Sequence, residues 1–224
     1  VARVPDNLSL VEAAATPEAF ITAHDAVFAQ AELKDAETLL VHAVGSGVGL
    51  AALQIAKANG HRVLGTSRTQ DKLDRCKEFG LDEAIVVAGE PDFASEVRSL
   101  TDGRGVDVIL DLVGGPYFEQ NLGSLATKGR LMLVGLTAGA RAEFNLGLAL
   151  SKRLKLIGTV LRGRPNDEKA DAVRAFERDV LPMLVDGRVR PTVDKVFGAA
   201  NVREAHSYLE SNESFGKVLL EFVS

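Results

Sequence analysis

The sequence is poor in cysteine and contains no long apolar run. Cys76 is the only cysteine among 224 residues, which excludes an internal disulfide and a four-cysteine zinc lobe. Its surroundings, DKLDRCKEFG, have helical spacing, so we predict that the thiol packs in the interior. No apolar segment reaches the length of a membrane span, and the first residues are unlike a signal peptide. We therefore expect a cytoplasmic protein that does not bind membranes.

Basic stretches and nucleophile sets are also missing. The formal net charge is −5, and no long run collects the 26 Lys and Arg residues, so nucleic acid is not an expected partner. No Ser/His/Asp or Cys/His arrangement is evident, and neither is a repeat. The chain does not begin with Met, which we interpret as a processed or truncated start. Hydrophobic residues make up 46% of the sequence, enough for one large domain or one domain with part of another.

The most informative segment is 38–72, TLLVHAVGSGVGLAALQIAKANGHRVLGTSRTQDK. Residues 38–43 form a short apolar run, 50–59 have apolar residues at helical spacing before Gly60, and 62–66 have the pattern of a second buried strand. A turn with three glycines separates the first strand from the helix. Such a turn presents backbone N–H groups at a helix N-terminus, where the helix dipole attracts phosphate. The segment therefore predicts a dinucleotide-binding unit.

The glycine spacing departs from the common fingerprint G-x-G-x-x-G. Gly45, Gly47 and Gly49 alternate with other residues, whereas a variant A-x-x-S-x-x-G fits residues 43–49. In that variant Ser46 takes the middle position, and Gly49 lies where strand and helix pack closely. An ordinary turn without a ligand would have a similar composition. The strand–helix–strand context favours the ligand-binding interpretation.

The end of the second strand discriminates between the two nicotinamide dinucleotides. Enzymes that use NAD place a carboxylate about 20 residues past the turn, where it binds the ribose hydroxyls. Here the segment TSRTQDK presents hydroxyls, then Arg68 and Lys72, while Asp71 is expected inside the next helix. An arginine can pair with a 2′-phosphate, which a carboxylate would repel. We therefore predict NADPH as the cofactor; the alternative is that either cation is a solvated surface charge.

The rest of the chain alternates between strand and helix patterns. Apolar strands separated by amphipathic helices predict a parallel sheet with helices on both faces. Right-handed crossovers then give an α/β fold, a doubly wound parallel sheet of the Rossmann type with strand order 3-2-1-4-5-6, and a ligand beyond the first and fourth strands. The predicted strands are 38–43, 62–66, 84–87, 105–111, 129–135 and 155–161, and the predicted helices are 8–15, 18–31, 50–59, 70–79, 92–100, 116–126 and 146–150.

The two ends of the chain depart from this alternation. Thr16 is the expected N-cap of helix 18–31, with Pro17 as its first helical residue. At the other end, some elements are expected to belong to a neighbouring domain. These elements are a long helix over 167–185, a strand over 192–197, a helix over 202–209 and a terminal strand over 217–222.

Several motifs together resemble one family. The segments ATPEAFITAHDAVF, VHAVGSGVGLAALQIAK, GRGVDVILDLVGG and FGKVLLEF are similar to zinc-independent quinone oxidoreductases of the medium-chain dehydrogenase/reductase superfamily, most of all to the tumour-suppressor-induced branch. The likeness extends over nearly the whole chain. It implies a dinucleotide domain packed against a GroES-like substrate domain, which an N-terminal segment and the C-terminal end build together.

The resemblance also implies a domain division and an assembly. Residues 1–12 would be the exit of a truncated GroES-like domain, 13–162 the dinucleotide-binding Rossmann domain, and 163–224 a C-terminal helix and the return to the substrate domain. We expect about a hundred residues before this start to be missing. Proteins of this family pair through their sixth strands, so we expect a homodimer through the apolar edge strand 155–161.

The cofactor-binding candidates fall into three groups. Arg68 follows from charge and Gly49 from the glycine spacing, whereas the other candidates follow from the resemblance. Val87 stands where the family often has a tyrosine near the adenosine, so one contact is missing. Core packing is the alternative role for the apolar members. The candidates are Ser46, Gly47, Val48 and Gly49 at the pyrophosphate, Arg68, Thr69 and Lys72 at the 2′-phosphate, and Thr22, Val113, Leu136 and Leu161 around the nicotinamide.

The expected function is NADPH-dependent reduction of quinones or other conjugated carbonyls, such as enones, by hydride transfer. The protein would supply orientation and an apolar cleft. We expect no metal and name no catalytic side chain, because a reduced quinone can take its protons from water. Two alternatives stay open. The chain could be an NADPH-binding module that is inactive without its missing domain, or the enoyl-reductase portion of a larger synthase.

Overall fold

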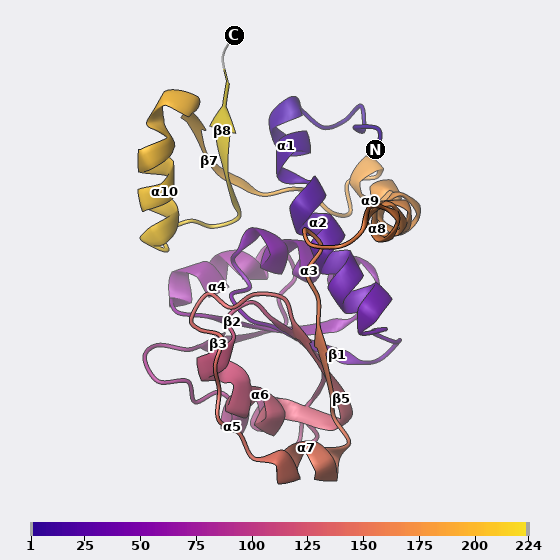
Figure 1. Cartoon of the computed structure of the whole chain (residues 1–224), viewed down its shortest axis with the longest axis vertical. Coiled ribbons are helices and arrows are strands. Elements are labelled where there is room, and N and C mark those ends of the chain that lie inside the picture. Colours follow the sequence, from indigo (N-terminus) through magenta and orange to yellow (C-terminus); the bar gives the residue numbers. More distant parts are fainter. Residues whose placement is uncertain (1, 223–224) are drawn as a thin grey trace.

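A six-stranded parallel sheet forms the centre of the molecule, in the order β3-β2-β1-β4-β5-β6 (Figure 1). The computed structural model describes residues 2–222. The order reverses its direction between β1 and β4, which pair with each other in parallel. This arrangement confirms the predicted α/β, doubly wound Rossmann fold. The strands of the sheet are β1 (Thr38–Val41), β2 (Arg62–Ser67), β3 (Glu83–Val86), β4 (Val106–Asp111), β5 (Leu125–Leu133) and β6 (Lys155–Gly158).

Helices cover both faces of the sheet (Figure 1). On one face lie α2 and α3, and on the other lie α5, α6 and α7. Within residues 2–222, no helix has the length and apolar character that a membrane crossing requires. The α-helices are α1 (Leu10–Ala15), α2 (Pro17–His24), α3 (Gly47–Ala58), α4 (Gln70–Lys77), α5 (Ala94–Leu100), α6 (Phe118–Ser124), α7 (Leu146–Lys152), α8 (Asn166–Asp179), α9 (Leu181–Val185) and α10 (Val202–Glu210).

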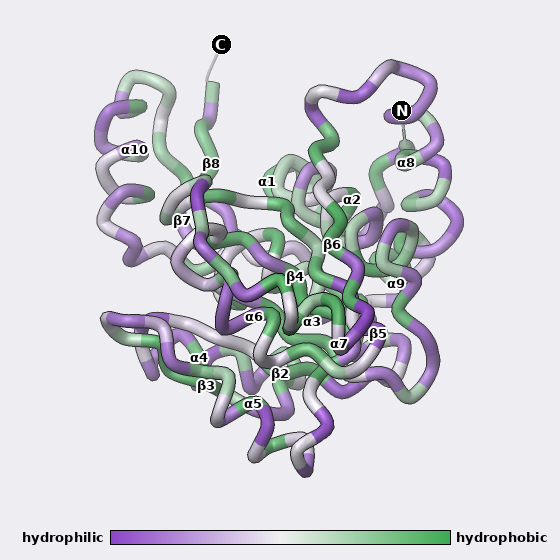
Figure 2. Tube along the Cα trace, turned by 60° about the horizontal axis from the view of Figure 1, so that its bottom comes forward, coloured by the Kyte–Doolittle hydropathy of each residue, from purple (hydrophilic) through white to green (hydrophobic). Residues whose placement is uncertain are grey.

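The central strands are buried on both faces, so their side chains divide between two cores. In β1, Leu39 and Val41 belong to the core beneath α2 and α3, whereas Leu40 belongs to the core beneath α5 and α6. This alternation follows from the two-residue period of a strand. Figure 2 shows the hydrophobic character of the strands in the middle of the molecule. A strand buried in this way reads as a continuous apolar run.

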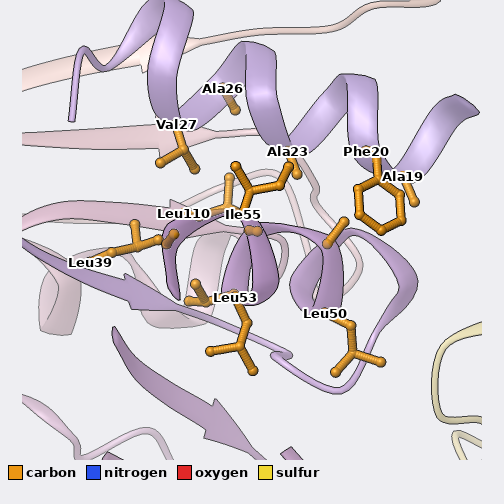
Figure 3. Close-up of a cluster of buried hydrophobic side chains, with 14 of the residues drawn as sticks. Ala19, Phe20, Ala23, Ala26, Val27, Leu39, Leu50, Leu53, Ile55 and Leu110 are labelled. Atoms are coloured by element: carbon orange, nitrogen blue, oxygen red, sulfur yellow. The ribbon is translucent and has the colours of Figure 1, made fainter. Parts of the chain in front are cut away.

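Helix α2 packs directly across α3, and small side chains make the close approach possible. Figure 3 shows the side chains of α2 and the following turn pointing down onto α3. Alanines in the contact leave room for the larger side chains around them, as close packing of the interior requires. The packing fixes the start of α3, and therefore the glycine turn, relative to the rest of the chain. The residues labelled between the two helices are Ala19, Phe20, Ala23, Ala26, Val27 and Ile55.

The predicted helix 18–31 differs from the observed one in two respects. It begins at Pro17, but the Thr16 hydroxyl donates to the carbonyl of Glu12 at 2.8 Å and makes no side-chain cap for α2. Thr16 is therefore the N-cap residue of α2, as predicted, but it also ends α1 and its side chain does not cap α2. The second half is a π-helical turn, Asp25–Gln30. This wider turn places Asp25 and its neighbours near the cleft described below, an arrangement that is typical of functional sites.

Three further boundaries differ from the sequence pattern, two because of contacts with distant residues and one because of a proline. Helix α6 ends at Ser124, because Lys152 donates to the carbonyls of Leu122, Gly123 and Leu125, and β5 begins at once. Strand β6 ends at Gly158, after which Thr159 and Arg164 turn toward Asp25. The predicted helix 167–185 is two helices, since Pro182 lacks the N–H that a continuous helix would need.

A small C-terminal unit stands beside the sheet, as Figure 1 shows. Strands β7 (Val193–Gly198) and β8 (Lys217–Glu221) pair in parallel, and α10 packs against them. The segment before β8 returns to the glycine turn, where Gly216 forms a bridge with Ser46. The C-terminal end of the chain therefore contacts the region in which the sequence predicts the cofactor. The assignment of this unit to a GroES-like domain stays a prediction.

Candidate functional site

A cleft of about 940 Å³ lies beyond the carboxyl ends of the strands, where the sheet order reverses. Ligands of open α/β sheets bind at this switch point, and the volume suits a large cofactor. Gly49, Thr69 and Leu136 do not line the cleft, and Leu136 is 55% exposed. The structure brings eight predicted residues together in the wall, namely Thr22, Ser46, Gly47, Val48, Arg68, Lys72, Val113 and Leu161.

The glycine turn presents free amides to the cleft. Ser46 is the N-cap of α3, and its hydroxyl accepts from the Gly49 amide at 3.1 Å. In the part of the chain that the structure describes, the Gly47 and Val48 amides have no acceptor. Unpaired amides at a helix N-terminus carry partial positive charge and bind phosphate. The turn can therefore accept a pyrophosphate through the backbone of two residues.

Two glycines of the turn are needed for different reasons. A Cβ at Gly49 would lie 2.6 Å from the carbonyl oxygen of Ala43 and 2.7 Å from that of Val44. This agrees with the predicted role of Gly49, close packing of strand and helix. At Gly47 a Cβ would lie 2.5 Å from Cδ of Lys217. The absence of a side chain at Gly47 thus lets Lys217 of the C-terminal segment pack directly against the turn.

The C-terminal segment contributes a wall that the predicted site residues do not include. Gly216 donates its amide to the carbonyl of Gly45 at 2.9 Å, and Lys217 lies over the turn with its ammonium 3.8 Å from Glu18. Phe215 packs beside Gly45 and beneath the guanidinium of Arg75. In the sequence, the motif FGKVLLEF indicated the family, but it did not predict that these residues would contact the site. A cation above the turn adds positive charge where a pyrophosphate would bind.

The carboxyl end of β2 carries two cations and no carboxylate. Arg68 and Lys72 both line the cleft, and the Lys72 ammonium donates to the carbonyl of Asn212 in the turn before β8. Burial, and after it the nearby Arg68 guanidinium, lower the pKa of Lys72. Two neighbouring cations repel each other, and a bound anion between them would relieve this repulsion. This pair is suited to a phosphate group on a ribose.

The opposite end of the cleft combines apolar side chains with a buried ion pair. Thr22, Val113 and Leu161 line this part, together with Asp25. Asp25 is 6% exposed and accepts two hydrogen bonds from Arg164, at 2.9 and 2.5 Å. The bond to Asp25 raises the pKa of Arg164. The ion pair closes this end of the cleft and holds the chain after β6 against the π-helical turn that follows α2.

Aromatic and aliphatic side chains line the cleft beyond β3 and β4. Val87, in the place of the family's tyrosine, is buried and lines the cleft with Pro91. Tyr117, from the segment after β4, lines the same cleft. Sequence reasoning gave Tyr117 no role, and no spacing rule in the chain points to it. Within the described residues, the cleft therefore has an aromatic side chain in its lining, although it comes from a different element.

The described residues do not fit a bound metal ion. Within residues 2–222, no group of three or more His, Cys, Asp or Glu side chains is placed to hold one. Cys76 is buried in α4, and burial raises the pKa of its thiol to about 12. A cysteine ligand must be a thiolate, so this side chain is a poor candidate. Its packing role agrees with the sequence-based prediction.

Comparison with known proteins gives relatives that include quinone oxidoreductases and polyketide synthases. The chain is 29% identical to the quinone oxidoreductase of Pseudomonas aeruginosa over 97% of its own length and 66% of the relative. Several polyketide synthases also match, but the chain covers only 10% of one and 5% of another. The chain thus spans about two thirds or less of the curated relatives it matches.

Solved structures share the fold over nearly the whole chain. Mycobacterial Rv1454c in complex with NADPH has a TM-score of 0.87 and 29% identity, covering 98% of this chain and 68% of the other. The JamJ enoyl reductase has a TM-score of 0.85 and 27% identity, covering 99% of this chain and 66% of the other. Both similarities include the cleft and the C-terminal unit.

A family model for zinc-binding dehydrogenases matches residues 47–178, which is more than half of the chain. The matched range begins inside the glycine turn and includes β2, β4 and β5. It therefore contains the amides of the turn, the two cations at β2 and the segment after β4. The chain belongs to the zinc-binding dehydrogenase family, and its six-stranded sheet is the NAD(P)-binding Rossmann domain of that family.

Proposed function

We propose that this protein reduces quinones or other conjugated carbonyls by hydride transfer from NADPH. The observation that carries the proposal is the cleft itself, with free amides at the glycine turn and Arg68 and Lys72 at the end of β2. The similarity to a quinone oxidoreductase supports the reaction class. The similarity to a structure complexed with NADPH supports the cofactor. We include in this proposal that the protein belongs to the zinc-independent branch, as its sequence suggests.

Each part of the cleft has a distinct task in this proposal. The Gly47 and Val48 amides hold the pyrophosphate, and Lys217 adds a positive charge above it. Arg68 and Lys72 hold the 2′-phosphate. Bound NADPH supplies the hydride. Thr22, Val113 and Leu161 orient the nicotinamide and exclude water, and no side chain of the described residues is assigned as a proton donor.

Binding and turnover of the full-length protein test this proposal. Titration calorimetry should give a lower Kd for NADPH than for NADH. Stopped-flow absorbance should show oxidation of NADPH when a simple quinone such as 1,4-benzoquinone is added. Tighter binding of NADH would contradict the assignment of Arg68 and Lys72. Binding of NADPH without oxidation by any quinone or enone would leave a cofactor-binding module and reject the enzyme.

A second candidate is an enoyl reductase within a larger synthase. The matches to polyketide synthases and to the JamJ enoyl reductase favour it. The two candidates share the cofactor and differ in the acceptor. A crotonyl thioester tested beside a quinone separates them, because an enoyl reductase should prefer the thioester. The sequence of the full gene provides a second test, since a synthase would encode acyl-carrier or ketosynthase segments.

We also propose that two copies of the chain pair through β6. This strand is at the edge of the sheet; Leu156 within it is 40% exposed, and Val160 just beyond its end is 61% exposed. An exposed apolar edge strand favours pairing with a second strand. Light scattering coupled to size exclusion should give the mass of a dimer. A monomeric mass at micromolar concentration would contradict this assembly.

A further inference from the structure

A chain of four buried polar side chains runs behind the wall of the cleft. Asp111 at the end of β4, Asn121 in α6, His42 after β1 and Thr66 in β2 are each 0–1% exposed. The Asn121 amide donates to Asp111 Oδ2 at 3.0 Å, and its carbonyl oxygen lies 2.6 Å from His42 Nε2. His42 Nδ1 lies 2.9 Å from the Thr66 hydroxyl. Every link joins two different elements of the fold.

The hydrogens along this chain have one consistent arrangement. Because the Asn121 amide donates to Asp111, its carbonyl oxygen must accept, so His42 carries its hydrogen on Nε2. His42 Nδ1 then accepts from the Thr66 hydroxyl. Burial lowers the pKa of His42, which keeps the ring neutral as this arrangement requires. All members of the chain have a partner, and the direction of donation is the same from Thr66 to Asp111.

Both ends of the chain reach groups that face the cleft. At one end Asp111 Oδ1 accepts the amides of Val113 and Gly114, at 2.8 and 2.9 Å. At the other end Thr66 lines the cleft, and its carbonyl accepts the amide of Val44 in the glycine turn at 3.0 Å. The middle of the chain supports the wall as well, because the Tyr117 ring stands edge-on to His42 with centroids 4.9 Å apart.

A purely structural core would not need these groups. Four buried polar side chains cost desolvation that apolar residues of the same volume avoid, while a fully bonded network specifies one geometry. Here the fixed geometry lies between two parts of the cofactor cleft that different strands contribute. The adenosine side depends on Thr66 and the turn, and the nicotinamide side depends on Val113 and Gly114.

We propose that Asp111, Asn121 and His42 form a positioning chain that sets the two halves of the cofactor cleft relative to each other. The role for the cofactor rests on the proposed function, but the mechanical coupling does not. A change in the middle of the chain should therefore disturb both ends. None of these residues touches a reacting atom, so they are positioning residues and not catalytic ones.

Amide hydrogen exchange by NMR tests the coupling without any cofactor. In the variant Asn121→Leu, the amides of Val113 and Gly114 should exchange about tenfold faster, although their acceptor Asp111 is unchanged. The amide of Val44, which reports on Thr66, should be faster as well. The matched control is Leu122→Ala, which truncates a fully buried neighbour on the same helix and leaves the chain intact. Faster exchange confined to α6 in both variants would overturn the proposal.

A second variant keeps the test decisive if Asn121→Leu does not fold. Thr66→Val replaces one hydroxyl by a methyl group and removes only the last link. Val113 and Gly114 should then exchange a few times faster, although they lie on the opposite side of the network. Unchanged exchange at these two amides would show that the ends are independent. That result would reject the positioning role.

Cofactor affinity provides the functional arm. At a temperature well below the unfolding midpoint of each variant, Asn121→Leu should raise the Kd for NADPH and for NADH by about tenfold, while Leu122→Ala should leave both unchanged. Unchanged affinity in Asn121→Leu would overturn the role in cofactor binding. If the wild-type protein binds neither dinucleotide, the proposed function fails, and the exchange experiment still decides whether the two sides are coupled.

Discussion

Lys217 lies across Gly47, so the last strand of the chain covers the turn that begins α3. A Cβ at Gly47 would be only 2.5 Å from Cδ of Lys217 and 3.0 Å from its Cγ. The two residues are far apart in the sequence, yet the Lys217 side chain packs directly against the turn at Gly47. The dinucleotide cleft is therefore complete only when the C-terminal unit is in place.

Substitution of Gly47 by alanine should affect cofactor binding more than stability. The added methyl group must displace the Lys217 side chain, which is flexible, and it would partly fill the space that a phosphate needs. We expect the Kd for NADPH to rise about tenfold, while the free energy of unfolding changes by about 1 kcal/mol or less. Calorimetry and thermal denaturation measure the two effects. Gly158→Ala is the control, because a Cβ there meets nothing within 4 Å; equal affinities of the two variants would contradict the prediction.

Substitution of Gly49 by alanine should instead destabilise the fold. Its Cβ would meet the backbone of Ala43 and Val44 at 2.6–2.8 Å, and backbone cannot move aside as a lysine side chain can. We expect a loss of about 2–4 kcal/mol in the free energy of unfolding, measured by urea denaturation. A variant as stable as the wild type would show that strand and helix can separate without cost.

Removal of the cation at Lys72 should reduce the preference for NADPH. In Lys72→Gln the 2′-phosphate loses one charged partner, so the Kd for NADPH should rise about tenfold while the Kd for NADH stays constant. Arg68→Gln should act in the same direction. Because the pKa of Lys72 is lowered in the free protein, the preference should weaken at alkaline pH before an ordinary lysine would titrate. An equal loss of affinity for NADPH and NADH would show that Lys72 contacts a part of the cofactor other than the 2′-phosphate.

The thiol of Cys76 should be inert in the folded protein. With its pKa raised to about 12, only about one thiol in ten thousand is ionised at pH 8. A thiol reagent such as DTNB should therefore react slowly in buffer and at once in denaturant. Since the unfolded thiol ionises at lower pH than the folded one, this group disfavours the fold increasingly as pH rises above about 9. Rapid labelling of native protein at pH 8 would contradict its burial.

Local patterns predicted the part of the fold that depends on short-range structure. The central strands β1 and β4 are buried along their whole length and appear as largely apolar runs, because strands covered on both faces have no polar side. The boundaries at Leu125, Gly158 and Pro182 were less predictable. The first depends on Lys152, which follows Leu125 only after the rest of β5 and most of α7. The second depends on an ion pair between Arg164 and Asp25, and Asp25 lies far away in the sequence. Only the break at Pro182 has a purely local cause.

The candidate site divides in the same way. The turn around Ser46 and the cations at Arg68 and Lys72 could be predicted, because strand, turn and helix are contiguous and the residue types carry the chemistry. Lys217, Tyr117 and the His42–Asn121 contact could not, since no short-range period relates them to the turn.

By itself the sequence determined the alternation of strands and helices, the position of the glycine turn and the sign of the charge beside it. These features depend on neighbouring residues and on side-chain chemistry. The tertiary structure alone decided that the C-terminal segment covers the turn. It also decided that a chain of buried polar side chains connects the two sides of the cleft. Such contacts depend on which strands become neighbours when the sheet forms, and a local sequence pattern does not show which distant residues will meet.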